Sequence, residues 1–216
     1  MINYKITPNF LSHEWHITLS FTQPNDYETE ISLPNWVPGS YLIRDFARHI
    51  THISARCDDK AQLLTQTSKN HWQTPALSGA WEIYYTVYAF DLSVRGSFLS
   101  TERGFFDGAC LFFKVHGQEE QPHQVEFSTL PHTWQIATTL PQISATTFQT
   151  ASYSRFVFTY KQAFFPFFRR PLYISNPNNT ATPSAPAVLF ALLFLQISFN
   201  NKSLINHPYK AANNKT

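Results

Sequence analysis

The strongest constraint on the fold is a two-residue alternation of apolar and polar side chains near the start of the chain. In residues 15–21 every odd position is Trp, Ile, Leu or Phe, and every even position is His, Thr or Ser. A strand with one buried face has this period, whereas a helix does not. Further short segments of this kind follow at residues 27–33, 50–56, 81–90, 111–115 and 125–127.

With 16% aromatic and 14% charged residues, the composition also favours a β-rich core. We therefore predict an all-β protein. The expected architecture is an antiparallel β-sandwich with a short helical insert, followed by an irregular C-terminal tail.

One segment is unusually dense in turn-forming and aromatic residues. Residues 33–50 have the sequence LPNWVPGSYLIRDFARHI. Pro38 fixes φ and Gly39 can adopt a positive φ, so residues 37–40 are predicted to form a type II turn. The short helical insert is expected directly after that turn, over residues 41–48.

The same segment contains an adjacent pair of opposite charges. Arg44 and Asp45 lie between the apolar residues Ile43 and Phe46. Apolar flanks favour burial, so we predict a partly buried, hydrogen-bonded ion pair. Such a pair specifies geometry more than it adds stability, because desolvation offsets most of the attraction.

Two later segments extend the pattern. Residues 84–98, YYTVYAFDLSVRGSF, lead from a β-rich run into a loop that continues as TERGFFDG at residues 101–108, and residues 134–141 are WQIATTLP. Together with WVPGSYLIRDFAR at residues 36–48, these motifs resemble the N-terminal domain of the M61 family of zinc metallopeptidases, the glycyl aminopeptidase group. Several motifs in the same order make the resemblance specific.

The resemblance implies a function for the parent enzyme and a restricted role for this chain. Enzymes of the family use zinc to remove N-terminal Gly and Ala residues from peptides, so peptides are the substrate of the parent family. The chain is expected to be the non-catalytic N-terminal domain, truncated before the catalytic domain, which would be its partner. The matched residues expected at that interface, or bordering the substrate cleft, are Tyr41, Arg44, Asp45, Arg95 and Arg103.

The sequence offers no catalytic zinc motif. His13 and His16 flank Glu14 and Trp15, but they are three residues apart, and zincins need the four-residue spacing of H-E-x-x-H on a helix. Strand alternation would also turn the two rings to opposite faces. No H-E-x-x-H occurs in the 216 residues. We therefore predict no catalytic residue, no metal ligand and no cofactor in this chain, and no peptidase activity by the chain alone.

The composition changes near residue 153. All 14 acidic residues lie at or before Glu126, and the later part is rich in Phe, Asn and Pro. Residues 1–153 are predicted to form the β-sandwich domain. Residues 154–216 are predicted to be an atypical tail, frameshifted or disordered, with a genuine but divergent tail as the alternative.

Location and partner class follow from three further observations. The apolar run at residues 188–195 is shorter than the ~20 residues that span a bilayer, so no membrane partner is expected. The first ten residues, MINYKITPNF, lack the regions of a signal peptide, which predicts a cytoplasmic location. Residues 1–126 carry nine Lys and Arg against 14 acidic residues, so nucleic acid is not an expected partner.

A function of another class stays open. The chain could be a free-standing β-sandwich binding module that uses the arginine and aromatic loop at residues 95–108 as its contact surface. The alternative for these arginines is structural, because they could pair with Asp91, Glu102 and Asp107.

Overall fold

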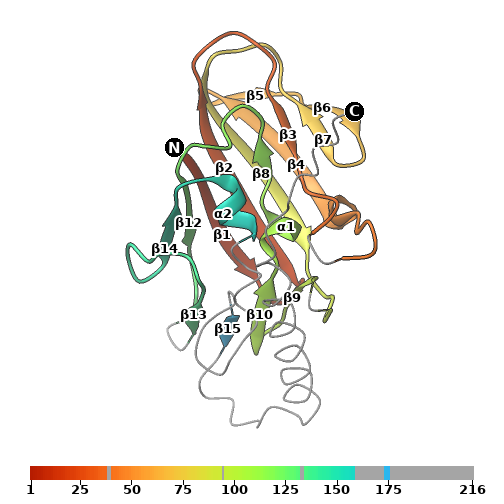
Figure 1. Cartoon of the computed structure of the whole chain (residues 1–216), viewed down its shortest axis with the longest axis vertical. Helices are drawn as coiled ribbons and strands as arrows, with labels where there is room; N and C mark the ends of the chain where they lie inside the picture. The colour runs from red at the N-terminus through yellow and green to blue at the C-terminus, as the bar shows by residue number, and fades with distance from the viewer. Residues whose placement is uncertain (38–39, 94, 132–133, 159–172, 176–216) are drawn as a thin grey trace, which may run out of the picture.

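The structure is a computed structural model, and it describes residues 1–37, 40–93, 95–131, 134–158 and 173–175. Short strands dominate it, arranged in three sheets (Figure 1). The strands are β1 (Ile2–Asn9), β2 (Glu14–Gln23), β3 (Glu30–Ser32), β4 (Ile50–Cys57), β5 (Lys60–Gln62), β6 (Thr65–Ser68), β7 (His71–Gln73), β8 (Gly79–Tyr88), β9 (Ser97–Leu99), β10 (Arg103–Phe106), β11 (Lys114–Val115), β12 (His123–Phe127), β13 (Gln135–Ala137), β14 (Thr147–Thr150) and β15 (Tyr173–Ser175). The helices are η1 (Phe46–His49, a 3-10 helix), α1 (Gly108–Leu111) and α2 (Tyr153–Phe158). The all-β prediction is confirmed.

The largest sheet has seven strands in the order β14-β12-β1-β2-β8-β4-β5. Its centre is the antiparallel pair β2 and β8, which match residue for residue from Glu14 opposite Tyr88 to Gln23 opposite Gly79. The odd-numbered residues of 15–21 are all buried, as the alternation predicts. One pair departs from the predicted antiparallel arrangement, because β1 and β12 run parallel.

A smaller sheet, in the order β11-β3-β7-β6, forms the other side of the core. Trp72 of β7 and Tyr85 of β8 both contact the ring of Phe113, with centroid separations of 5.2 and 4.6 Å. Phe113 is fully buried between the two sheets. This sheet-on-sheet contact is the packing expected of a β-sandwich. The third sheet, in the order β13-β15-β10-β9, lies below the other two in Figure 1.

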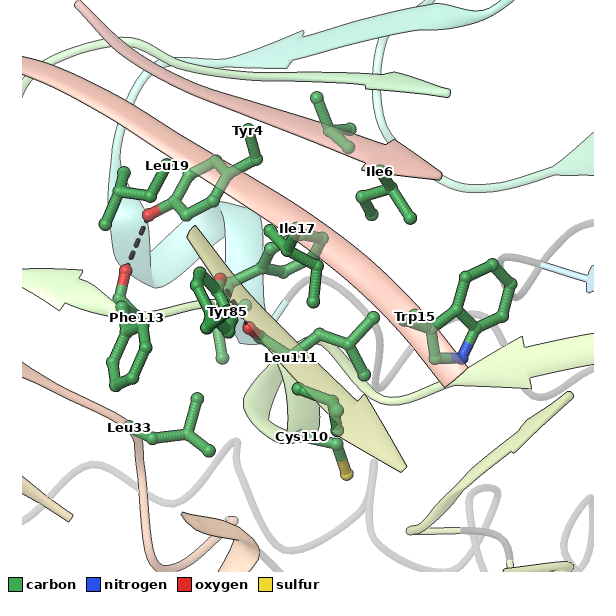
Figure 2. Close-up of a cluster of buried hydrophobic side chains, with 14 of the residues drawn as sticks. Tyr4, Ile6, Trp15, Ile17, Leu19, Leu33, Tyr85, Cys110, Leu111 and Phe113 are labelled. Carbon is green, nitrogen blue, oxygen red and sulfur yellow. Dashed lines mark hydrogen bonds between the residues drawn. The ribbon is translucent and has the colours of Figure 1, made fainter. Parts of the chain in front are cut away.

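The buried backbone of residues 111–113 is held by tyrosine hydroxyl groups (Figure 2). Tyr85 donates to the Leu111 carbonyl at 2.7 Å, and Tyr4 donates to the Phe113 carbonyl at 2.6 Å. Tyr153 donates to the Phe112 carbonyl between them at 2.8 Å. Three consecutive carbonyls thus each accept a hydrogen bond from a different part of the chain. Their burial would otherwise be costly.

A strand predicted for this part of the chain is wrong in part. The sequence pattern predicts a strand over residues 111–115, but α1 extends to Leu111 and only Lys114–Val115 forms a strand. Asp107 caps α1 by accepting a hydrogen bond from the Ala109 amide at 2.9 Å. An apolar run of this length does not distinguish a strand from a buried helical turn.

The predicted helical insert is shorter than expected and begins later. Residues 41–48 were expected to be helical, whereas η1 spans Phe46–His49. Asp45, the residue before it, adopts a left-handed conformation with φ 45°. Such a residue cannot continue a right-handed helix, so the segment before it stays irregular. Pro38 and Gly39, on which the predicted turn depends, lie outside the described residues.

Packing continues past residue 153, where the sequence analysis placed the end of the domain. In α2, Phe156 and Val157 are buried, and the Phe156 ring lies 4.4 Å from that of Phe112 and 5.1 Å from that of Tyr4. Farther on, β15 pairs with β10 and β13, although its residues belong to the segment predicted to be irregular. Most of the predicted tail, residues 159–172 and 176–216, lies outside the described residues.

No helix in the described part of the chain has the length and apolar character needed to cross a bilayer. The apolar run at residues 188–195, on which the sequence prediction about membranes rests, lies outside that part.

A buried histidine links the fold to pH. His123 is fully buried, its Nδ1 lies 2.7 Å from the Gln121 carbonyl oxygen, and its ring packs against Tyr4, Tyr153 and Phe156. Burial lowers the pKa of His123 from 6.5. Between the lowered value and 6.5, the unfolded chain therefore binds more protons than the folded one.

The contribution of neutral His123 to the free energy of unfolding should accordingly be fully present above about pH 7. It should be lost as the pH drops through 6.5 toward the lowered pKa of His123. His123→Phe should reduce this acid-side loss, measured by urea denaturation between pH 7.5 and pH 5.5. Part of the loss should persist, since burial also lowers the pKa of His49 and His116. An unchanged pH dependence in His123→Phe would show that His123 titrates alike in both states.

Candidate functional site

Hydrogen bonds join described residues of the segment between β3 and η1, which carries the motif at residues 36–48 and is called the signature segment below. The Trp36 indole donates to the Ser40 carbonyl at 2.8 Å, and the Arg44 amide donates to the Asn35 carbonyl at 2.7 Å. The Ser40 hydroxyl donates to the Leu42 carbonyl at 2.8 Å and accepts from Arg44 Nε at 3.2 Å. Ser40 thus organises the loop, which explains why a small hydroxyl residue stands at this position.

The predicted ion pair is wrong in its partners. Asp45 lies near Lys69, with Oδ2 3.7 Å from Nζ, while Arg44 bonds to Ser40. Both Arg44 and Asp45 are half-buried. Ile43, the apolar residue before Arg44, is exposed and therefore does not cover the two charged side chains. The left-handed backbone of Asp45 turns adjacent side chains apart, which residue order alone does not reveal.

The same segment presents an exposed apolar surface, which we call the apolar ridge (Trp36, Tyr41, Leu42 and Ile43). Tyr41 is fully exposed, and the exposed fractions of Trp36, Leu42 and Ile43 are 44%, 67% and 70%. Four large apolar side chains are thus exposed within eight residues of the sequence, and exposed apolar side chains that gather in this way are typical of interaction surfaces.

A second loop, at residues 91–97, faces the signature segment. Asp91 Oδ1 accepts from the Ser93 amide at 2.8 Å and Oδ2 accepts from its hydroxyl at 3.0 Å. The Asp91 amide donates to the Ser97 carbonyl at 3.0 Å. A Cβ at Gly96 would lie 2.7 Å from Asp91 Oδ2, so a larger residue there would have to displace the Asp91 side chain. Asp91 therefore sets the loop's conformation.

The two motif-bearing loops meet at a small cleft. Arg44 and Arg95 both line it, together with Asp91, His49 and Cys110, and it encloses a cavity of about 20 Å³. The Cys110 thiol donates to the Arg95 carbonyl at 3.3 Å. Burial raises the pKa of Cys110 well above its usual value, so this residue stays a thiol and is poorly suited to be a nucleophile. The cleft brings together two of the residues predicted from the sequence, Arg44 and Arg95.

The remaining predicted residues lie elsewhere. Tyr41 belongs to the apolar ridge, and Asp45 lies near Lys69. Arg103 is exposed on β10, with its guanidinium 5.6 Å from the centroid of the Phe98 ring. Phe98 in turn stacks between Phe90 and Phe105, at 5.2 and 5.8 Å. Arg103 thus covers an aromatic row and does not line the cleft.

The His13-to-His16 segment does not fit a zincin metal site. His13 precedes β2 with φ 57°, and its Nδ1 is 2.6 Å from the Leu99 carbonyl oxygen. His16 lies on β2 with Nε2 3.5 Å from Glu14 Oε2. Trp15 between them is buried in the core. The two rings therefore have separate partners, and the segment is a strand where the motif requires a helix.

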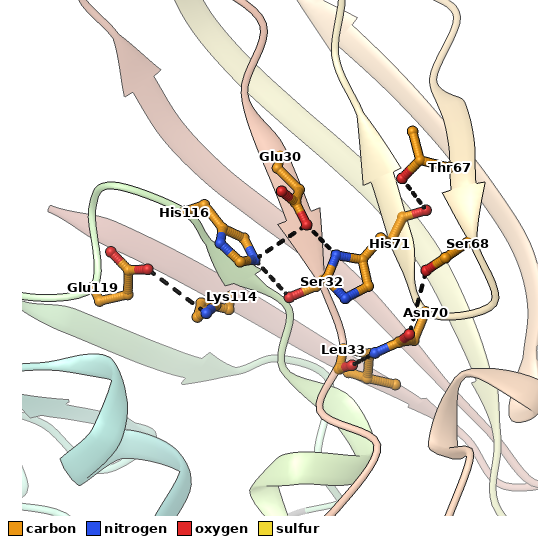
Figure 3. Close-up of polar contacts among 10 residues, drawn as sticks. All are labelled: Glu30, Ser32, Leu33, Thr67, Ser68, Asn70, His71, Lys114, His116 and Glu119. Atoms are coloured by element: carbon orange, nitrogen blue, oxygen red, sulfur yellow. Dashed lines mark hydrogen bonds and ion pairs between the residues drawn. The ribbon is translucent and has the colours of Figure 1, made fainter.

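Sequence reasoning missed a different group of side chains. Glu30, His71 and His116 come from three neighbouring strands or strand ends, and Figure 3 shows them directed toward one another. The signal available was a repeated polar–apolar–polar pattern at residues 30–32, 71–73 and 114–116. This pattern places alternate side chains on one face, but it does not reveal which strands are neighbours.

Comparison with known proteins agrees with the fold and with the motifs. The family model described as the Peptidase M61 N-terminal domain matches residues 3–157. Among solved structures, the chain is similar to an aminopeptidase N family protein from Idiomarina loihiensis, with 37% identity and a TM-score of 0.69. That match covers 73% of this chain and 28% of the other, so this chain spans less than a third of that relative's length. No curated protein matches the chain. The chain therefore belongs to the M61 peptidase family and carries its N-terminal domain.

Proposed function

We propose that this chain is a non-catalytic domain that docks against the peptidase domain of an M61 enzyme through the apolar ridge. The observation that carries the proposal is the exposure of Tyr41, Leu42 and Ile43 next to Ser40, whose hydroxyl bonds to the Leu42 carbonyl and to Arg44. Hydrogen bonds made before docking reduce the conformational entropy that residues 40–44 lose on binding. The adjacent cleft, with Arg44 and Arg95 in its wall, would then border the peptide substrate.

The chemistry in this proposal belongs to the parent enzyme. Its zinc, its hydrolysis of N-terminal Gly and Ala residues and its peptide substrate come with the peptidase domain. This chain would supply no ligand to that zinc, because no H-E-x-x-H occurs in its sequence. We place neither nucleic acid nor membrane among its partners. A cytoplasmic location accords with the free thiols of Cys57 and Cys110.

A chimaera tests the docking role. Residues 3–157 would replace the matching segment of the Idiomarina loihiensis protein, and the test variant would carry Tyr41→Ser with Ile43→Ser. We expect an active aminopeptidase whose thermal unfolding temperature and activity both fall in the variant. Each side chain removed from an apolar contact is worth about 1.5–3 kcal/mol.

The same double substitution in the free chain should change the free energy of unfolding by less than about 0.5 kcal/mol, because the two side chains are already in water. Leu63→Ser, at another exposed leucine, is the matched control and should leave both proteins unchanged. Equal losses in the chimaera from the ridge variant and from Leu63→Ser would refute the docking role.

The structure gives less support to the free-standing binding module. Its proposed contact loop, residues 95–108, is mostly turned inward, and residues 96–99 and 106–108 are buried. Arg103 and the half-exposed Phe90 are accessible to a partner. However, the Arg103 guanidinium and the Phe90 ring both already pack against the Phe98 ring. Tyr41, Leu42 and Ile43 of the apolar ridge are each more exposed than Phe90.

A further inference from the structure

The exposed face of the small sheet places potential metal ligands on three adjacent strands. In the register of β3 and β7, Ser32 lies opposite His71, and in that of β11 and β3, Val115 lies opposite Ile31. The His116 amide donates to the Glu30 carbonyl at 3.0 Å, which continues the pairing of β11 with β3 by one residue. Glu30, His71 and His116 consequently share one face.

The other face of these strands is anchored in the core. Ile31, Trp72 and Val115 alternate with the polar residues and are all buried. A ligand set carried by strands that are fixed on their reverse side keeps its geometry better than one carried by loops.

The polar atoms converge on one carboxylate oxygen (Figure 3). Oε1 of Glu30 contacts Nδ1 of His71 and lies 3.7 Å from Nε2 of His116. One ligand atom from each residue lies within 4.8 Å of the other two. The side chains of His71, Glu30 and His116 remain 34%, 41% and 29% exposed, so an ion can reach them from solvent.

We propose that Glu30, His71 and His116 form a binding site for one divalent transition-metal ion of the zinc class. Two imidazole nitrogens and one carboxylate oxygen suit such an ion, and three protein ligands leave a fourth position for water. Tetrahedral coordination at about 2.0–2.2 Å puts ligand atoms roughly 3.3 Å apart. To reach that spacing, the Glu30–His71 contact would have to lengthen, and the 3.7 Å separation between Glu30 and His116 would shorten.

The charged and polar groups around the three proposed ligands are compatible with a bound cation. Lys114, a cation close to the site, lies with Nζ 3.7 Å from Glu119 Oε1, which offsets its charge. Ser32 Oγ holds His116 Nε2 at 2.8 Å and would release it to the ion while staying close enough to bond a metal-bound water. Bound metal would link β3, β7 and β11, which have only two or three residues each. This inference does not depend on the proposed docking role.

The test uses the full chain, freed of metal by a chelator and titrated with Zn²⁺ in equilibrium dialysis. We expect one Zn²⁺ per chain and a rise in the unfolding temperature with Zn²⁺ concentration. His71→Ala, His116→Ala and Glu30→Gln should each weaken binding on the order of 100-fold or more, since even outer partners of ligands are worth about 10–100-fold.

His16→Ala is the matched control, because His16 also lies beside a glutamate on a strand but belongs to the seven-stranded sheet. It should leave affinity and stoichiometry unchanged. Circular dichroism would verify that each variant is folded, and Glu30→Gln preserves the side-chain shape should a histidine variant fail to fold. Absence of saturable Zn²⁺ binding, or equal binding by wild type and Glu30→Gln, would overturn the proposal.

Discussion

Phe156→Ala should lower the free energy of unfolding of this chain by about 3–5 kcal/mol. The Phe156 ring is buried in α2 and packs against Tyr4, Phe112 and His123, with centroid separations of 5.1, 4.4 and 5.8 Å. Truncation would remove its apolar surface from the core and leave a cavity beside β1. Urea denaturation of the wild type and the variant measures the loss.

Phe90→Ala is the matched control for this substitution. Phe90 is half-exposed and stacks on Phe98, so its removal should cost no more than about 1.5 kcal/mol. If Phe156→Ala costs as little as Phe90→Ala, then α2 contributes nothing to the core. The domain would in that case end near residue 153, as the sequence analysis predicts.

Tyr85→Phe should cost about 1–3 kcal/mol, although it removes a single oxygen atom. The Tyr85 hydroxyl is buried and donates to the Leu111 carbonyl at 2.7 Å. Without it, a buried carbonyl next to the end of α1 loses this donor in a site that is closed to water. Denaturation midpoints, together with an unchanged circular dichroism spectrum, would show that the loss is energetic and not a change of fold.

Tyr88→Phe provides the comparison, because Tyr88 lies three residues along the same strand but is exposed. Its hydroxyl is free to bond water in either state, so the change should be within about 0.5 kcal/mol. A Tyr85→Phe variant as stable as Tyr88→Phe would mean that the Leu111 carbonyl finds another donor, and the tyrosine contacts would then not be what fixes residues 111–113.

The predictions that succeeded rest on patterns shorter than about ten residues. Alternation at residues 15–21 identified β2 and its buried face, and the same logic located β4 within one residue of its ends. The predicted strand at residues 111–115 failed because burial on all sides removes the alternation. The predicted ion pair between Arg44 and Asp45 does not form, because the left-handed backbone of Asp45 changes the directions of the adjacent side chains.

The sequence by itself determined that this chain is all-β and which family it belongs to. Side-chain period is a property of consecutive residues, and the motif at residues 36–48 is contiguous. Only the tertiary structure decided which strands are neighbours. It brought Glu30, His71 and His116 together across 41 and 45 residues of chain, and it directed three tyrosine hydroxyls to the buried carbonyls of residues 111–113. The physical reason is that strand pairing depends on burial and on contacts between distant segments, which local pattern does not encode.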